Sequence, residues 1–165
     1  MNILSKIVAV KKQEIELLYR QYNVADLQTQ CTKKPRPSTP LFYVSLAEAR
    51  QRGESFFISE FKRKSPSEGW INQYADLPAQ LRAYAKAGAR AISVLTDTSF
   101  FGGAYSDLAL AADTLSTLQS RPLLLQKDFV LDPIQIYLAR LHGADMILLI
   151  AAILEPSDLQ HLKNI

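Results

Sequence analysis

The sequence predicts an α/β fold in which parallel strands alternate with helices, and two observations carry the prediction. From Phe56 onward, short runs of leucine and β-branched residues are separated by helical stretches long enough for right-handed crossovers. Two segments also echo each other, YAKAGARAISVL at 84–95 and LARLHGADMILL at 138–149. Near-continuous apolar strands are typical of a parallel sheet covered by helices. The repeats therefore indicate successive βα units, four in all.

The elements before the repeats are helical. Residues 2–20 place their apolar side chains at the spacing of an amphipathic helix. Residues 32–40, TKKPRPSTP, contain three prolines, which remove backbone donors and predict a stiff connector. A second short helix is predicted over 41–53, ended by its final glycine. We expect residues 1–54 to form an amino-terminal helical extension and residues 55–165 to form the repeating part.

The repeating part divides into strands and helices of ordinary length. The predicted strands are 56–61, 91–96, 123–126 and 146–150. The predicted helices between them are 76–87, 106–119 and 133–142. Asp132-Pro133 and Glu155-Pro156 each put a residue suited to capping before a proline at the first helical position. The second pair therefore predicts a further helix at the end of the chain.

Composition excludes several classes of protein. With 165 residues, 48% of them hydrophobic, the chain can bury a core as one globular unit. A net charge of +3 and scattered lysines and arginines argue against a nucleic-acid partner. A single cysteine, Cys31, and two separated histidines, His142 and His161, argue against a disulfide or a structural zinc site. Because no signal peptide or bilayer-spanning run is present, we expect a soluble, cytoplasmic protein without a membrane partner.

Ligands of parallel βα folds bind at the carboxyl ends of the strands, so those ends hold the candidate site. The stretch FFISEFKRKSPSEG at 56–69 is apolar early and charged late. It places Glu60 and Lys62 at the end of the first strand and Ser65 in a basic, hydroxyl-rich loop. This combination indicates a site for an anion. A plain ion pair that closes the strand is the alternative.

The end of the third strand supplies a second candidate. Alternation puts Lys127 on the same face as Leu123 and Leu125. Lysine is rarely buried without a reason, and an interior lysine held by an acid can donate a proton. The alternative is a structural ion pair of Lys127 with Asp97 or Glu60.

Other conspicuous residues have plainer interpretations. Phe100 and Phe101 are typical of core or loop anchors, and Trp70 is typical of a packing residue. His142 lies at the carboxyl end of a predicted helix, where a histidine interacts favourably with the helix dipole. Gly102-Gly103 lacks the spacing of a dinucleotide fingerprint, and no Walker A sequence is present.

Three motifs, taken in order, resemble those of the indole-3-glycerol-phosphate synthase family of tryptophan-pathway enzymes, which fold as (βα)8 TIM barrels. The first is EFKRKSPS at 60–67. The second is SVLTD at 93–97, followed by FFGG at 100–103. The third is KDF at 127–129, which continues through DPIQIYLAR at 132–140.

The resemblance implies a reaction and a role for each candidate residue. The family closes an indole ring on 1-(2-carboxyphenylamino)-1-deoxyribulose 5-phosphate with loss of carbon dioxide and water. Lys127 would protonate the ribulose carbonyl oxygen as general acid, Glu60 would orient that lysine, and Lys62 would pair with the substrate carboxylate or phosphate. Ser65 would help to hold the substrate, and no metal or cofactor is implied. The wall around the aryl ring would be formed by Phe101, Phe129 and Leu148.

In the family, the general-base glutamate and the phosphate-binding loops follow strands five to eight. This sequence reaches Ile165 within the helix after the predicted fourth strand. We therefore expect an amino-terminal half barrel that is inactive alone, with Leu123 and Leu125 exposed on its inner face. It should either self-associate through open sheet edges or remain a loosely packed monomer that binds hydrophobic dyes. In some bacteria the family's polypeptide also carries phosphoribosylanthranilate isomerase.

Three other readings remain open at the level of sequence. One is a Schiff-base aldolase on the same fold, with Lys127 as nucleophile. Another is a receiver-like signalling domain, although such a domain needs an acidic pair after its first strand, where this chain has Glu60 followed by lysines. The third is a half barrel without catalysis.

Overall fold

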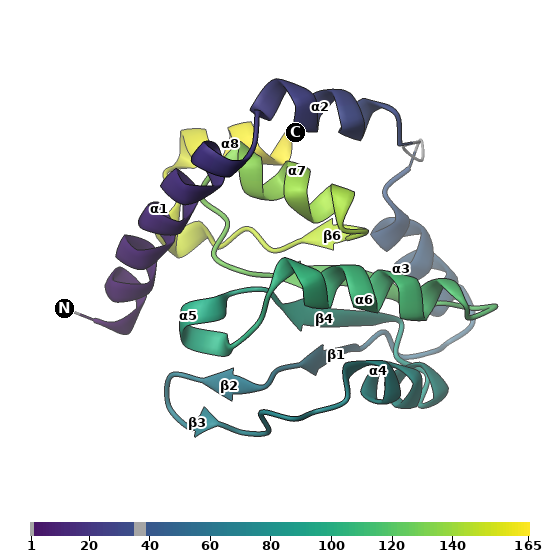
Figure 1. Ribbon diagram of the computed structural model, residues 1–165. Coiled ribbons are helices and arrows are strands. Elements are labelled where there is room, and N and C mark those ends of the chain that lie inside the picture. Colours follow the sequence, from purple (N-terminus) through teal and green to yellow (C-terminus); the bar gives the residue numbers. More distant parts are fainter. Residues whose placement is uncertain (1, 35–38) are drawn as a thin grey trace.

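The computed structural model describes residues 2–34 and 39–165, and its centre is a four-stranded parallel sheet (Figure 1). The strands lie side by side in chain order, which is the arrangement that successive right-handed βα units produce. The strands are β1 (Ile58–Phe61), β4 (Ala91–Leu95), β5 (Leu123–Lys127) and β6 (Met146–Ile147). The connecting helices are α4 (Leu77–Lys86), α6 (Tyr105–Ser116) and α7 (Pro133–Leu141). The predicted sheet and its three connecting helices are confirmed.

Side-chain caps begin α4 and α7, the second as the sequence predicted, whereas α6 starts without a side-chain cap. At α4 the Asp76 carboxylate accepts a hydrogen bond from the Ala79 amide at 3.0 Å. At α7 Asp132 and Gln135 form a capping box, with Pro133 at the first helical position. These caps satisfy backbone donors that a helix start would otherwise leave without partners.

The main core lies between the sheet and helices α4 and α6. Ile92, Val94 and Leu124 point from the strands into this layer and are fully buried. Leu81 of α4 and Leu108 of α6 meet them there, equally buried. Each such side chain contributes about 1.5–3 kcal/mol through burial. The core holds the strands in register and so sets the positions of the residues at their carboxyl ends.

Three helices precede the first strand: α1 (Ile3–Gln21), α2 (Val24–Thr32) and α3 (Leu41–Gln51). In Figure 1, α1 lies near the carboxyl ends of the strands, on the same side as α5, whereas α3 lies toward the opposite side. The sequence predicted α1 and α3 but not α2, which begins at the Asn23 cap. The predicted connector overlaps α2 at Thr32, and its residues 35–38 lie outside the described part of the chain.

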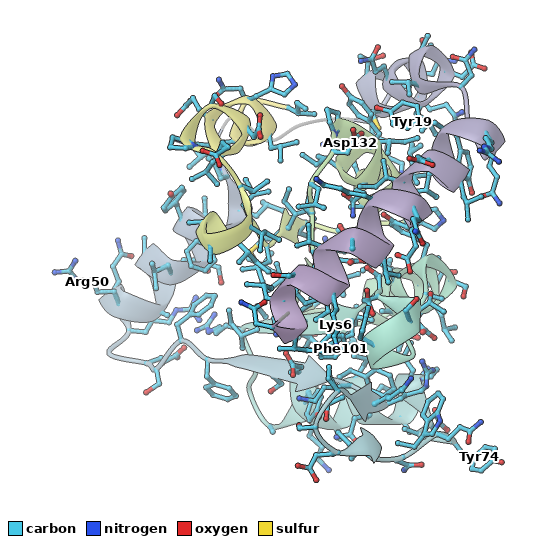
Figure 2. The ribbon with its side chains drawn as sticks, turned by 90° about the vertical axis from the view of Figure 1, so that its left-hand side faces the viewer. Lys6, Tyr19, Arg50, Tyr74, Phe101 and Asp132 are labelled. Atoms are coloured by element: carbon cyan, nitrogen blue, oxygen red, sulfur yellow. The ribbon has the colours of Figure 1, made fainter. Side chains whose placement is uncertain are left out.

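Helices α1 and α2 pack against α7 rather than standing apart from the repeats. Ile15 of α1 and Leu27 of α2 share a small apolar cluster with Ile134 and Leu138 of α7. The Tyr19 hydroxyl of α1 also donates a hydrogen bond to the Asp132 carboxylate at 2.8 Å, and Figure 2 shows the two side by side. The amino-terminal helices are thus anchored on the helix that follows β5.

Further elements were not predicted, and they follow three of the four parallel strands. After β1 the chain forms an antiparallel hairpin where the sequence predicted only a loop, and Tyr74 projects into solvent beyond it (Figure 2). The unpredicted elements are β2 (Lys64–Ser65), β3 (Gly69–Trp70), α5 (Thr98–Phe101) and the 3-10 helix η1 (Ala151–Ile153). The final helix, α8 (Pro156–Lys163), starts where Glu155-Pro156 predicted it, but the Glu155 side chain forms no capping hydrogen bond.

Two expectations about the sheet were wrong. The fourth strand ends at Ile147 instead of residue 150, because its ladder with β5 joins only Met146 and Ile147 to the last part of that strand. Leu123 is not exposed on the inner face but only 9% exposed. It borders one cavity together with Leu41 and Val44 of α3, so α3 lies close to this end of the sheet. Leu125 is partly exposed, closer to the expectation.

Candidate active site

The register of the sheet brings the predicted site residues to one face. Glu60 of β1 lies opposite Ser93 of β4, and Ser93 lies opposite Leu125 of β5. Because side chains alternate along a strand, Lys127 projects from the same face as Leu125, one step nearer the carboxyl end. The helices occupy the opposite face, where the core lies. The acid and the lysine therefore meet on the face that the helices leave open.

The Glu60 carboxylate binds two lysines at once. One oxygen accepts a hydrogen bond from the Lys127 ammonium, and the other lies 3.1 Å from the Lys62 ammonium. Each of the three side chains is about one-third exposed, so the group opens to solvent. Partial burial would raise the pKa of Glu60, but the hydrogen bonds from Lys127 and Lys62 outweigh it and hold that pKa below its ordinary value.

This geometry decides which acid pairs with Lys127. The sequence left Asp97 and Glu60 open, and Glu60 is the partner. Asp97 is fully buried and pairs instead with Lys11 of α1, at 2.9 Å. Lys127 is also less enclosed than its leucine-rich strand suggested, because its side chain is 34% exposed. A lysine bound by a carboxylate and open to solvent can meet a ligand from that side.

Two aromatic rings gather at the same end of the sheet. Phe101 closes the short helix α5 after β4, and Phe129 follows β5 by two residues. Their ring centroids are 6.0 Å apart at an interplanar angle of 34°, a distance typical of paired aromatic side chains. Leu148 follows β6, and its amide donates a hydrogen bond to the Gln126 carbonyl at 3.3 Å, which holds it beside β5. All three predicted wall residues thus lie at carboxyl ends of neighbouring strands.

Ser65 has a different setting from the other candidates. It is only 7% exposed, and it lies in the hairpin rather than on the sheet. Its hydroxyl accepts a hydrogen bond from the Glu68 amide at 3.1 Å and shares one with the Ser67 hydroxyl at 3.3 Å. In this structure Ser65 holds the tip of the hairpin together.

The basic loop after β1 uses two of its three cations to fix the hairpin. The Arg63 guanidinium forms a bidentate pair with Asp107 of α6, at 2.7 and 3.0 Å. The Lys64 ammonium donates to the Ser99 carbonyl at 3.0 Å and lies 5.6 Å from the centre of the Trp70 ring. Lys62 alone of the three turns to the acid of the site. The sequence suggested one anion-binding cluster and offered no signal for this division, since each partner lies far along the chain.

The residue that sequence reasoning missed is Lys11. Its side chain comes from the amino-terminal helix α1 and is buried among Glu14, Asp97 and Asp128. In the sequence it is one of several lysines in an amphipathic pattern, which predicts a solvated helix face. His142 agrees with its structural interpretation, because its Nδ1 lies 2.7 Å from the Leu138 carbonyl at the end of α7. Trp70 packs over Gly102 but stays 50% exposed.

Across residues 2–34 and 39–165, no group of three or more His, Cys, Asp or Glu side chains is arranged to hold a metal ion. No helix within the same residues combines the length and apolar character needed to span a membrane. The described site brings together a carboxylate, two ammonium groups and aromatic side chains.

These features place the chain among the α/β proteins that carry a polar site at the carboxyl ends of parallel strands. The family model described as indole-3-glycerol phosphate synthase matches residues 4–165. The chain belongs to the indole-3-glycerol phosphate synthase family, a TIM-barrel family, as its motifs predicted.

Individual relatives agree with the family match. The chain is similar to an indole-3-glycerol phosphate synthase of Bacteroides thetaiotaomicron, with 38% identity over 99% of the chain and 58% of the relative. It is 42% identical to the Bacillus cereus protein of the same name, over 99% of the chain and 57% of the relative. A multifunctional tryptophan biosynthesis protein of Schizosaccharomyces pombe is 39% identical over 98% of the chain and 21% of the relative. The chain thus spans little more than half the length of these bacterial relatives.

Proposed function

We propose that the chain supplies the amino-terminal half of an indole-3-glycerol phosphate synthase in tryptophan biosynthesis. In this proposal residues 1–54 are a helical extension, and residues 55–165 are the first half of a (βα)8 barrel. The activity is the decarboxylating ring closure of 1-(2-carboxyphenylamino)-1-deoxyribulose 5-phosphate. The observation that carries the proposal is the Glu60 carboxylate shared by Lys127 and Lys62 at the carboxyl ends of β1 and β5.

Each residue has a task that suits its setting. Glu60 binds Lys127 in the ammonium form, which is the form that a general acid needs to protonate the ribulose carbonyl oxygen. Lys62 pairs with the other oxygen of the same carboxylate, and its ammonium is exposed enough to meet an anionic group of the substrate as well. Phe101 and Phe129 provide flat apolar surfaces for the aryl ring. Charge and aromatic surface at one strand end suit an anionic aromatic sugar phosphate.

Leu148 completes the apolar wall in this proposal, and Ser65 acts through the hairpin that it closes, helping to hold the substrate from that side. The partner is a small anionic molecule rather than a nucleic acid or a membrane, in keeping with a net charge of only +3 and scattered cations. We place the enzyme in the cytoplasm, and the mechanism asks for no metal or cofactor.

The proposal is tested in a polypeptide that joins this chain to the remaining carboxyl-terminal part of the Bacillus cereus relative. Replacing Lys127 with methionine keeps the length of the side chain and removes the acid. Ring closure should fall by about 10²–10⁴-fold, while a non-reactive substrate analogue still binds. Turnover within a few-fold of the parent would refute the assignment.

Lys62→Ala is the matched variant, because Lys62 binds the other oxygen of Glu60. It should lower both the affinity for the analogue and the rate of ring closure. Added salt should weaken analogue binding by the parent more than analogue binding by the variant. Equal salt sensitivity would contradict the role in anion pairing. Borohydride treatment with a keto-sugar phosphate separates the aldolase alternative, since a Schiff base on Lys127 would be trapped and a general acid would not.

A further inference from the structure

Lys11 is a charged residue in an unusual place. It projects from α1, outside the βα repeats, yet it is only 3% exposed. Its ammonium lies 2.6 Å from Glu14, 2.9 Å from Asp97 and 2.9 Å from Asp128. Burial would lower the pKa of Lys11, but Asp128 and Asp97 outweigh it and raise that pKa above its ordinary value. The side chain is therefore a permanent cation in the interior.

Asp97 and Asp128 stand directly at the carboxyl ends of β4 and β5, and both are buried. Two carboxylates in an interior cannot both stay ionised at low cost unless a cation lies between them. Lys11 supplies that cation to both at once. The single ammonium thus joins the ends of two neighbouring strands.

The same two carboxylates also hold the backbone of the aromatic pair. One oxygen of Asp97 accepts hydrogen bonds from the amides of Phe100, at 2.7 Å, and Phe101, at 3.2 Å. One oxygen of Asp128 accepts a hydrogen bond from the Phe129 amide at 2.7 Å. The carboxylates that bind Lys11 therefore fix the backbone beneath both rings.

A second set of hydrogen bonds links Asp128 to Thr96, which follows β4, and through it to Gln126 of β5. The other oxygen of Asp128 accepts a hydrogen bond from the Thr96 hydroxyl, and the Gln126 amide group donates to that hydroxyl at 3.0 Å. Asp128 also follows Lys127 directly in the chain. A shift of Asp128 would accordingly move both the Phe129 ring and the backbone that carries Lys127.

Anchoring of α1 does not by itself explain this cluster. Ile15 packs against Ile134 and Leu138 of α7, and Tyr19 donates a hydrogen bond to Asp132 at the start of the same helix. Those contacts tie α1 to α7, whereas Lys11 reaches past them to the strand ends. The two tasks can therefore be separated by mutation.

We propose that Lys11 is a positioning residue that sets the backbone and mutual packing of Phe101 and Phe129 through Asp97 and Asp128. The connection from this aromatic pair to an aryl substrate rests on the proposed function. The positioning itself does not, because it is a property of the folded chain. An element outside the repeats thus shapes the wall of the site.

The test uses no substrate and is made in the polypeptide that joins this chain to the remaining carboxyl-terminal part of the Bacillus cereus relative, because the chain alone is expected to self-associate. Amide hydrogen exchange and ring-to-ring contacts are measured by NMR in the parent, in Lys11→Met and in Lys11→Arg, with Tyr19→Phe as the matched control from the same helix. We expect Lys11→Met to exchange about tenfold or more faster at the amides of Phe101 and Phe129 and to lose the contact between their rings. The amides of Ile92 and Leu124 should keep their protection. Lys11→Arg keeps the positive charge, so it should retain most of the parent's protection at these two amides and the contact between the rings. Tyr19→Phe should leave exchange at both amides unchanged.

Unchanged exchange at Phe101 and Phe129 in Lys11→Met would overturn the proposal. Equal acceleration throughout β4 and β5 would overturn it too, because that is the sign of general destabilisation alone. If Lys11→Met does not fold, the variant Lys11→Met with Asp97→Asn removes one unpaired charge, and the same comparison of amides decides. If Lys11→Met loses the ring contact and the joined polypeptide that carries it still closes the ring at the parent's rate, the result would count against the proposed function and not against this positioning role.

Discussion

Replacing Gly103 with alanine should be one of the most damaging small changes available in this chain. Gly103 follows the short helix α5 and lies against the end of β4. An alanine Cβ there would come within 2.0 Å of the Leu95 carbonyl oxygen and 3.0 Å of the Thr96 amide nitrogen. Ordinary contact begins at 3.4 Å, so the two backbone segments would have to separate by about 1.4 Å.

The surroundings of Gly103 leave little room for that shift. Its amide donates a hydrogen bond to the Asp97 carbonyl at 2.9 Å, and its carbonyl accepts one from the Thr98 hydroxyl at 2.8 Å. Overpacking of a core costs about 1–3 kcal/mol, and backbone on both sides puts Gly103→Ala at the upper end, about 3 kcal/mol. The turn it would disturb also carries Phe101 of the aromatic pair.

Urea unfolding followed by far-UV circular dichroism measures the loss, from the shift in midpoint at constant m-value. Gly53→Ala is the matched control, because Gly53 has a φ of +67° but no atom within 4 Å of the added Cβ. Its cost is backbone strain of about 1–2 kcal/mol, partly offset by a stiffer unfolded chain. The reasoning fails if Gly103→Ala is no more destabilising than Gly53→Ala.

Three other outcomes are expected. Tyr19→Phe removes the hydrogen bond to Asp132 and should cost about 0.5–1.5 kcal/mol at neutral pH. Because burial and then that hydrogen bond raise the pKa of Tyr19 from 10.0 to about 12, its stabilisation should be lost as the pH rises through this range, which alkaline urea titrations would reveal. The pKa of Glu60 is lower in the folded chain than its ordinary value of 4.5. The free energy of unfolding of the parent should therefore exceed that of Glu60→Gln above pH 4.5, and this difference should disappear as the pH falls below 4.5. A difference that grows on acidification would contradict the assignment. The chain alone, with β1 and β6 as sheet edges, should self-associate in sedimentation velocity and bind a hydrophobic dye, and Met146→Lys should reduce both; a dye-negative monomer at every concentration would count against it.

Local sequence patterns predicted the order of the strands and helices and the position of the candidate site. The order of the βα units and the start of α7 at Asp132-Pro133 follow from hydrophobic periodicity and capping, which operate within a few residues. The placement of Glu60 and Lys127 at carboxyl ends of strands follows from the same periodicity together with the general rule for parallel sheets. The motifs around these residues also predicted the family.

Only the tertiary structure decided which charges meet. Sequence alone left Asp97 and Glu60 equal as partners of Lys127. The register of β1 and β5 against β4 brings Glu60 close to Lys127, and the two side chains form an ion pair. Lys11 read as one solvated lysine among several, yet the packing of α1 near the strand ends buries it between Asp97 and Asp128. An ion pair depends on how two distant elements approach, and a periodicity within one element carries no information about that approach. The pairing of distant charges therefore had to come from the packed fold.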